Sequence, residues 1–188
     1  MKEFKIVPMC LETDKPEIES WETTFAAKPE FDGILHYVLE DNIYYGLGEV
    51  IETNFEIFPI GKDEAKHAFS VKAEDGEIIG FLISTIFGLT TKNPELHFGY
   101  IVLKPNHQSQ GYASAILTEF FENSKKYLGA KPTEIFAYIH KSNNQSINLF
   151  KRFGFDFSDK HGPDYFKAIA KMPEIQNRID EERSKNKQ

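Results

Sequence analysis

The sequence predicts a mixed α/β (α+β) fold, in which one central, mostly antiparallel sheet is flanked by helices. Two strand-like runs within 68–87 are joined at Asp75-Gly76, a dipeptide typical of tight hairpins. A third strand-like run, over 95–103, is followed by a helical pattern, then by another strand, another helix and a closing strand pair within 155–172. This order is typical of one sheet with helices packed on it.

Each element has its own local signals. The apolar stripe of the central helix consists of Ala115, Leu117, Phe120 and Phe121. Thr13 or Asp14 would cap the first helix, and Ser142 with Gln145 resembles a capping box. The predicted strands cover 4–9, 68–73, 78–87, 95–103, 133–140, 155–158 and 165–172, and the predicted helices cover 15–27, 30–40, 111–127 and 142–153.

Two segments give weaker patterns. Residues 42–63 are rich in Tyr, Phe and Gly, and we expect mixed loop and strand there. Residues 173–188 are charged, and we expect a frayed helix or a disordered tail after a single domain over 1–172.

Composition narrows the class of protein. The single cysteine, Cys10, excludes an intramolecular disulfide, so we expect a reducing, cytoplasmic setting, with Cys10 as a small buried side chain. No run approaches the ~20 apolar residues that span a bilayer, so we expect no membrane partner. The formal charge of −7 disfavours nucleic acid and suits a cationic partner such as an amine, although such a charge can also serve solubility alone.

The turn from Gln108 to Ala113 is a candidate anion site. It lies between a strand and a helix, where backbone N–H groups and the positive end of the helix dipole attract anions. The alternative is that Gly111 is only a turn residue. The segment lacks the Gly-Lys-Ser/Thr of a Walker loop and two of the three glycines of a dinucleotide fingerprint.

Two motifs follow each other in order, Gln108-x-x-Gly111-x-Ala113 and Asn143-x-x-Ser146-x-x-Leu149-Phe150-x-x-x-Gly154-Phe155. They resemble the Gln/Arg-x-x-Gly-x-Gly/Ala and Asn-x-x-Ala/Ser-x-x-Leu-Tyr-x-x-x-Gly-Phe patterns of the GNAT acetyltransferase superfamily. The segment from Glu77 to Phe81 is similar to the family's first hairpin. Gly99-Tyr100 and the Asn-x-x-Ser variant look most like the RimJ/RimL branch, which acetylates protein N-termini and related amines. The resemblance covers 66–172.

The resemblance implies an acetyl-CoA-dependent N-acetyltransferase that acts directly on a primary amine. The acceptor would be a protein N-terminus, a polyamine, an antibiotic or a small metabolite. The resemblance also implies a sheet that splays between 95–103 and 133–140 and forms the cofactor cleft, with Asn143 touching the pantetheine arm. The arm would follow the strand at Ile101, Val102 and Leu103, and the diphosphate would take amides of Gln108, Ser109, Gln110, Gly111, Tyr112, Ala113 and Ser114.

Amine acetylation needs a group that accepts the amine proton. His97 is the first candidate, because it occupies the position where some family members carry a catalytic Glu. Glu95, on the same strand face, is the alternative, and His140 is a weaker third. His97 could instead be an ordinary packed histidine, and some relatives use water alone.

The sequence departs from the family at the proton donor, since Phe150 replaces the expected tyrosine. Ser146, one helical turn earlier, could hydrogen-bond the departing sulfur, or could only let the helix approach the cofactor. Tyr138 and Tyr165 are other donors. Phe150 also keeps open a non-catalytic acyl-CoA-binding or regulatory domain.

Substrate choice is expected to lie in the segments that match the family least. We expect it to be set by the residues before Lys66 and by the loop 159–164, and we expect no metal. Assembly as a homodimer stays open. The aromatic residues that could line an acceptor pocket are Tyr44, Tyr45, Phe55 and Phe58.

Overall fold

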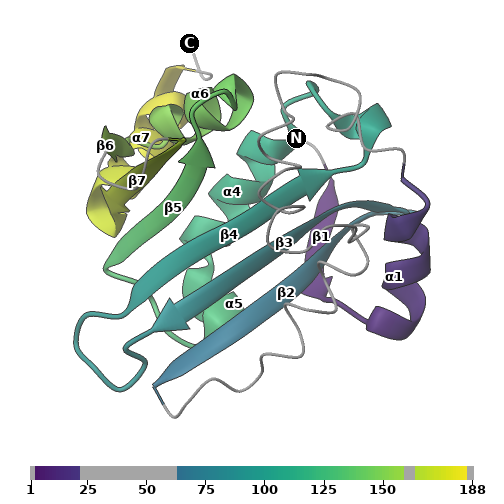
Figure 1. Cartoon of the computed structure of the whole chain (residues 1–188), viewed down its shortest axis with the longest axis horizontal. Helices are drawn as coiled ribbons and strands as arrows, with labels where there is room; N and C mark the ends of the chain where they lie inside the picture. The colour runs from purple at the N-terminus through teal and green to yellow at the C-terminus, as the bar shows by residue number, and fades with distance from the viewer. Residues whose placement is uncertain (1–2, 22–62, 159–163, 186–188) are drawn as a thin grey trace.

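A computed structural model describes residues 3–21, 63–158 and 164–185, which build a seven-stranded sheet in the order β1-β2-β3-β4-β5-β7-β6 (Figure 1). Strands β4 and β5 are parallel, and every other neighbouring pair is antiparallel. This confirms the predicted mixed α/β fold. The elements are β1 Phe4–Pro8, α1 Leu11–Glu19, β2 Glu64–Ala73, β3 Ile78–Phe87, β4 Glu95–Leu103, the 3-10 turn η2 Pro105–His107, α4 Tyr112–Glu122, α5 Ser124–Leu128, β5 Glu134–His140, α6 Asn144–Arg152, β6 Asp156–Ser158, β7 Tyr165–Lys171 and α7 Met172–Lys185.

Several sequence expectations lie outside the described residues. They are the helix over 30–40, the mixed segment 42–62, nearly all of the loop 159–164, and the aromatic residues Tyr44, Tyr45, Phe55 and Phe58.

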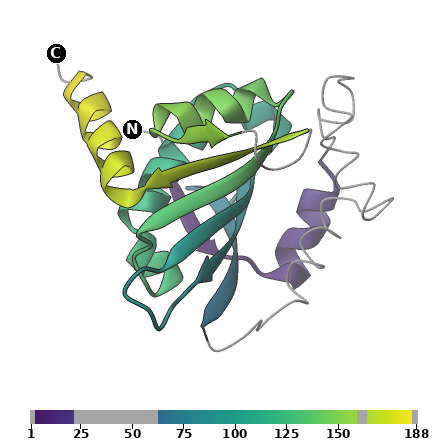
Figure 2. The same cartoon turned by 60° about the vertical axis from the view of Figure 1, so that its left-hand side comes forward.

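The sheet is packed on both faces. The larger core contains residues of α4, α6 and α7, including Phe120, Phe150 and Ile175. The smaller core lies on the other face, where Ile18 of α1 meets Phe81 and Val102. Figures 1 and 2 show α1 on the opposite side of the sheet from α4. Hereafter these are called the α4 face and the α1 face.

The first helix begins earlier than predicted. Cys10, rather than Thr13 or Asp14, is the residue before its first turn. Asp14 is buried instead, and its carboxylate accepts hydrogen bonds from Ser70 Oγ (2.5 Å), Lys72 Nζ (2.9 Å) and the Cys10 N–H (3.1 Å). The Cys10 side chain is exposed rather than buried, and a hydrogen bond with Thr13 lowers the pKa of its thiol.

The predicted helix over 111–127 is two helices, which meet at Asn123. The Asn123 side chain donates to the Glu119 carbonyl (3.2 Å), a local bond of the kind that competes with the helical ladder. The predicted capping box of α6 was also wrong. Asn143 caps this helix by accepting from the Ser146 N–H (3.0 Å), while Ser142 Oγ lies 2.6 Å from His140 Nδ1.

The charged C-terminal segment forms the ordered helix α7 from Met172 to Lys185. Ile175 and Ile179 are buried in the larger core, and Arg183 pairs with Glu122 of α4 through both guanidinium Nη atoms (2.5 and 2.7 Å). Three buried apolar residues, Met172 together with Ile175 and Ile179, therefore dock a helix whose remaining residues are mostly exposed. No helix in the described ranges is long and apolar enough to cross a membrane.

Candidate active site

Strands β4 and β5 are neighbours over only a short stretch. Their parallel pairing covers Glu95–His97 and Glu134–Phe136 and then stops, although the strands continue to Leu103 and His140. Figure 1 shows the two strands diverging toward their arrowheads. In the described part of the chain, the β4 edge that faces β5 therefore has no strand partner beyond His97.

A bulge in β4 lies immediately after the last paired residue. Ser84 of β3 opposes Phe98 and Ile83 opposes Tyr100, so Gly99 is the extra residue. A bulge changes which face the following side chains occupy and bends the strand. Phe98 packs in the core on the α4 face, whereas Tyr100 packs on the α1 face. The bulge thus turns the second half of β4 away from β5.

The segment after β4 forms a tight turn before α4. Ser109 (φ 57°) and Gly111 (φ 82°) both have left-handed backbone conformations. The side chain of Gln108 donates to the Leu103 carbonyl (3.0 Å) and closes the turn onto the end of β4. Helix α4 begins after Gly111 without a side-chain cap, so its first-turn amides have acceptors neither within the helix nor from a cap. This arrangement suits an anion.

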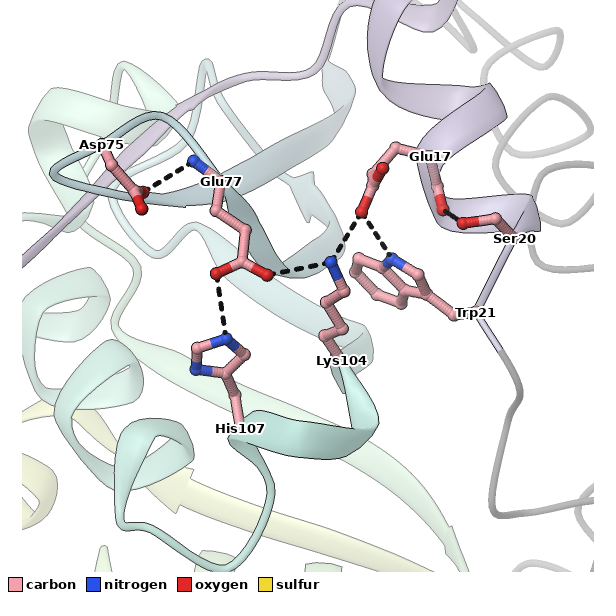
Figure 3. A network of polar contacts seen from close by, with 7 residues as sticks. All are labelled: Glu17, Ser20, Trp21, Asp75, Glu77, Lys104 and His107. Carbon is pink, nitrogen blue, oxygen red and sulfur yellow. Dashed lines mark hydrogen bonds and ion pairs between the residues drawn. The ribbon is translucent and has the colours of Figure 1, made fainter.

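A network of ionic contacts supports this turn from one side (Figure 3). Lys104, at the end of β4, pairs with Glu17 of α1 (2.7 Å) and Glu77 of β3's hairpin (2.9 Å). Glu77 also contacts His107 Nε2 (3.3 Å), and Glu17 accepts a hydrogen bond from Trp21 (3.4 Å). Three segments distant in the sequence therefore meet immediately before the turn.

The ionic network also shifts the pKa values of its two glutamates and its lysine. Hydrogen bonds from Lys104 hold the pKa values of Glu17 and Glu77 below their usual range, and the same two bonds raise the pKa of Lys104. His107 in turn meets Tyr112, the first residue of α4, edge-on with ring centroids 5.4 Å apart. The network thereby reaches the start of the helix whose amides line the turn.

His97 lies at the base of the splay, where β4 and β5 separate. Its ring is half-buried, is stacked on Phe136 (5.0 Å between centroids, 14° between planes) and lies 5.4 Å from Tyr138. Glu95, two residues earlier on the same strand face, is exposed. The structure therefore places both predicted proton acceptors on the α1 face, in the short stretch where β4 pairs with β5.

The second motif lies across the splay, at the start of α6. Asn143 uses its side-chain oxygen to cap the helix, and Ser146 occupies the first turn with a half-buried side chain. Phe150 points into the core, where it packs edge-on against Phe98 (5.9 Å) and Phe155 (4.9 Å). It cannot replace the proton donor that the sequence lacks at this position.

The remaining candidates lie farther along β5 and β7. His140 is at the end of β5, and its Nδ1 lies 2.6 Å from Ser142 Oγ. Its ring contacts Tyr165 of β7 edge-on (5.1 Å). Tyr138 is partly exposed, at 37%. These side chains share the face of His97 but lie beyond it, toward the end of β5.

Comparison with known families decides between these interpretations. The model of the acetyltransferase (GNAT) family matches residues 17–155, which is most of the chain. The chain belongs to this family. It is therefore an N-acetyltransferase that uses acetyl-CoA, as the two motifs predict, and no curated protein matches it in sequence.

Solved structures of acetyltransferases share the fold. A spermidine N-acetyltransferase from Vibrio cholerae, in complex with CoA and spermine, is 16% identical, with a TM-score of 0.65 over 93% of this chain and 99% of that one. An acetyltransferase from Thermus thermophilus (16% identity, TM-score 0.62, 91% and 99% coverage) and a PaiA N-acetyltransferase from Thermoplasma acidophilum in complex with coenzyme A (20%, 0.60, 90% and 99%) are similarly close. At such identities the likeness concerns the fold.

The backbone of β4 and of the turn before α4 fits acetyl-CoA. The β4 edge after His97 can pair with the amides of a pantetheine arm, as an added strand would. The turn at Ser109 and Gly111 would present amides to a diphosphate, and a Cβ built on Gly111 would meet nothing within 4 Å, so the space beside it is open. When bound, acetyl-CoA supplies an acetyl group activated as a thioester.

Two contributors to this site were not predicted from the sequence. Gly80 lies where β3 approaches β4 so closely that any side chain would collide with Val102 and Leu103. A glycine within a strand pattern is a known signal of close backbone approach, and it could have been used here. The Lys104–Glu77 contact had no such signal, because only the pairing of the strands brings these residues together.

Proposed function

We propose that this acetyltransferase transfers the acetyl group directly from acetyl-CoA to a primary amine, with His97 accepting the amine proton. One observation carries the proposal: the pairing of β4 with β5 ends at His97, although both strands continue. The β4 edge that lacks a paired strand therefore begins at the residue proposed to accept the proton. An amine that enters there would meet the imidazole before any other titratable group on β4 except the exposed Glu95.

The cofactor assignments follow the chain in order. The backbone at Ile101–Leu103 would pair with the pantetheine arm, and the amides of 108–114 would bind the diphosphate. Asn143 would contact the arm from across the splay through its side-chain nitrogen, which makes no hydrogen bond to the described residues. Within this set the Gln108 N–H already donates to the Pro105 carbonyl (3.2 Å), so the diphosphate would depend on the later amides of the turn.

The proton path uses side chains on both sides of the splay. An imidazole titrates near neutral pH and suits proton removal from an amine, directly or through water. Glu95 is the alternative acceptor. On the other side, Ser146 would donate a hydrogen bond to the departing sulfur, and water would deliver the proton, because a hydroxyl is too weak an acid to give it up.

The acceptor class proposed from the branch resemblance is a peptide N-terminus or a related amine. The V. cholerae relative was solved with spermine, so polyamines are the main competing acceptors. A homodimer in the reducing cytoplasm is part of the same proposal. The alternative function, a non-catalytic acyl-CoA-binding domain, draws on the buried Phe150 at the usual tyrosine position.

The test is release of free thiol from acetyl-CoA with a panel of peptides, polyamines, amino acids and aminoglycosides. We expect His97→Ala to lower kcat by about 100-fold or more and to remove the neutral-pH limb of the rate profile, without changing the CoA dissociation constant. His140→Ala serves as the matched control on β5 and should retain activity. An unchanged pH–rate profile in His97→Ala would remove His97 from the mechanism, and CoA binding without turnover across the panel would favour the non-catalytic alternative.

A further inference from the structure

Four residues form a row across the middle of the sheet. Lys66 of β2 is in register with Thr85 of β3, Thr85 with His97 of β4, and His97 with Phe136 of β5. Residues in direct register on neighbouring strands have side chains on the same face. The proposed proton acceptor is therefore two strands away from a lysine, with one threonine between them.

The row faces α1 rather than α4. The strand neighbours Ala65, Ile86, Leu96 and Ile135 all belong to or pack against the core on the α4 face. Because side chains alternate along a strand, the row must point to the α1 face. This is the face on which the acceptor amine would approach His97.

Lys66 is a half-buried cation that lacks a counter-charge. It makes no hydrogen bond or ion pair with any residue in 3–21, 63–158 or 164–185. Glu64, two residues earlier on its strand face, does not pair with it. Other half-buried lysines have a partner: Lys72 of β2 pairs with Asp14, Lys104 after β4 pairs with two glutamates, and Lys167 of β7 lies over the ring of Phe136 (4.8 Å).

A charged ammonium in this position costs the protein free energy of desolvation. Burial lowers the pKa of Lys66, because the charged form loses water without gaining a partner. Thr85 beside it is only 7% exposed, so little water reaches the row from the sheet side. An unpaired, partly desolvated charge near a reaction centre is typical of a binding group that awaits its ligand.

We infer that Lys66 binds a carboxylate of the acceptor, so that the preferred acceptor is a small amine that also carries a carboxylate. Neighbouring strands lie about 4.8 Å apart, which puts the Lys66 and His97 backbones about 10 Å apart. If the Lys66 and His97 side chains lean toward each other from these positions, the distance between their ends corresponds to the length of an amino acid or short peptide. The inference depends on the proposed function, since it requires the amine to react at His97.

The test compares acceptors that differ only in the carboxylate. Thiol release is measured with an amino acid, a dipeptide and the carboxamide of each, and kcat/KM of each variant is expressed relative to wild type for the same acceptor. Lys66→Met should lose roughly 10- to 100-fold with the carboxylates and less than about twofold with the amides, as expected for one charge-assisted hydrogen bond. Lys66→Arg should recover most of the loss. If kcat/KM of Lys66→Met falls more with the amino acid, the acceptor is a free metabolite. If it falls more with the dipeptide, the acceptor is a peptide N-terminus.

Controls separate this inference from the proposal on which it depends. Lys125→Met, at an exposed lysine of α5, should leave both acceptor types unchanged. An equal loss of both types in Lys66→Met, or a wild-type enzyme that prefers the amides, would overturn the carboxylate site while leaving the enzyme assignment intact. Failure of the wild type to acetylate any amine would overturn the proposed function itself, and this inference with it.

Discussion

Replacing Gly80 with alanine should weaken both folding and cofactor binding. A Cβ at this position would lie 2.6 Å from the Val102 carbonyl oxygen and 2.8 Å from Leu103 Cδ2. A carbon–oxygen contact normally needs about 3.3 Å, so β3 and β4 must separate by about 0.7 Å. Overpacking of this kind costs about 1–3 kcal/mol. For a chain of this length, that lowers Tm by about 2–12 °C.

The effect on cofactor binding follows from where the collision occurs. Val102 and Leu103 belong to the β4 segment proposed to pair with the pantetheine arm, so a shifted strand should raise the CoA dissociation constant several-fold. Thermal unfolding and calorimetric titration with CoA measure the two effects. Gly99→Ala is the matched control, because its Cβ would lie 3.3 Å from the Ile83 carbonyl oxygen and needs little movement. A Gly80→Ala protein with unchanged Tm and CoA affinity, or a Gly99→Ala protein that loses as much, would refute this reasoning.

Two further substitutions test the anion turn and the buried carboxylate. Gly111→Asp should weaken CoA binding by about tenfold or more, through strain of the left-handed backbone and repulsion of phosphate. Gly129→Asp is the control, because Gly129 is also left-handed with open space beside it, and this variant should bind CoA as the wild type does. Equal CoA dissociation constants for the two variants would contradict the phosphate placement. Asp14→Asn should cost about 2 kcal/mol in urea unfolding near pH 7. Burial raises the pKa of Asp14, but bonds from Ser70 and Lys72 outweigh it and hold the pKa below its usual value. The carboxylate therefore stabilises fully above the unfolded pKa of about 3.9, and its advantage over the asparagine variant should vanish as pH falls through the folded pKa; a gap that persists there would be inconsistent with this account.

The sheet was the most predictable part of the chain. Strands over 78–87 and 95–103 were predicted with the bounds that the structure shows, because each is a long apolar or alternating run closed by turn residues. Helix ends were less predictable, since they depend on side chains that have several possible partners. Ser142 has a good capping sequence, but it lies against His140, and Asn143 caps the helix instead.

The candidate site was predictable only where its residues lie close together in the sequence. The turn before α4 and the start of α6 are local motifs, and the structure places them on either side of the splay. The row that joins Lys66 to His97 depends on the register of two strand pairs, which no local pattern specifies. The docking of α7 was not predicted for a similar reason, because Ile175 and Ile179 are buried by residues that are distant in the sequence.

The shared ammonium of Lys104 has a consequence for shortened versions of the chain. Glu17 and Lys104 are 87 positions apart, yet one carboxylate–ammonium contact joins them. A protein trimmed to start after α1 would retain both sequence motifs and all strands from β2 onward. It would still lose one of the two anchors that hold the end of β4, and would expose the apolar surface under Ile18 and Trp21. Helix α1 thus stabilises, from a distant part of the sequence, the segment that leads into the anion turn. A fragment that is judged by its motifs alone would therefore be expected to bind more than it can.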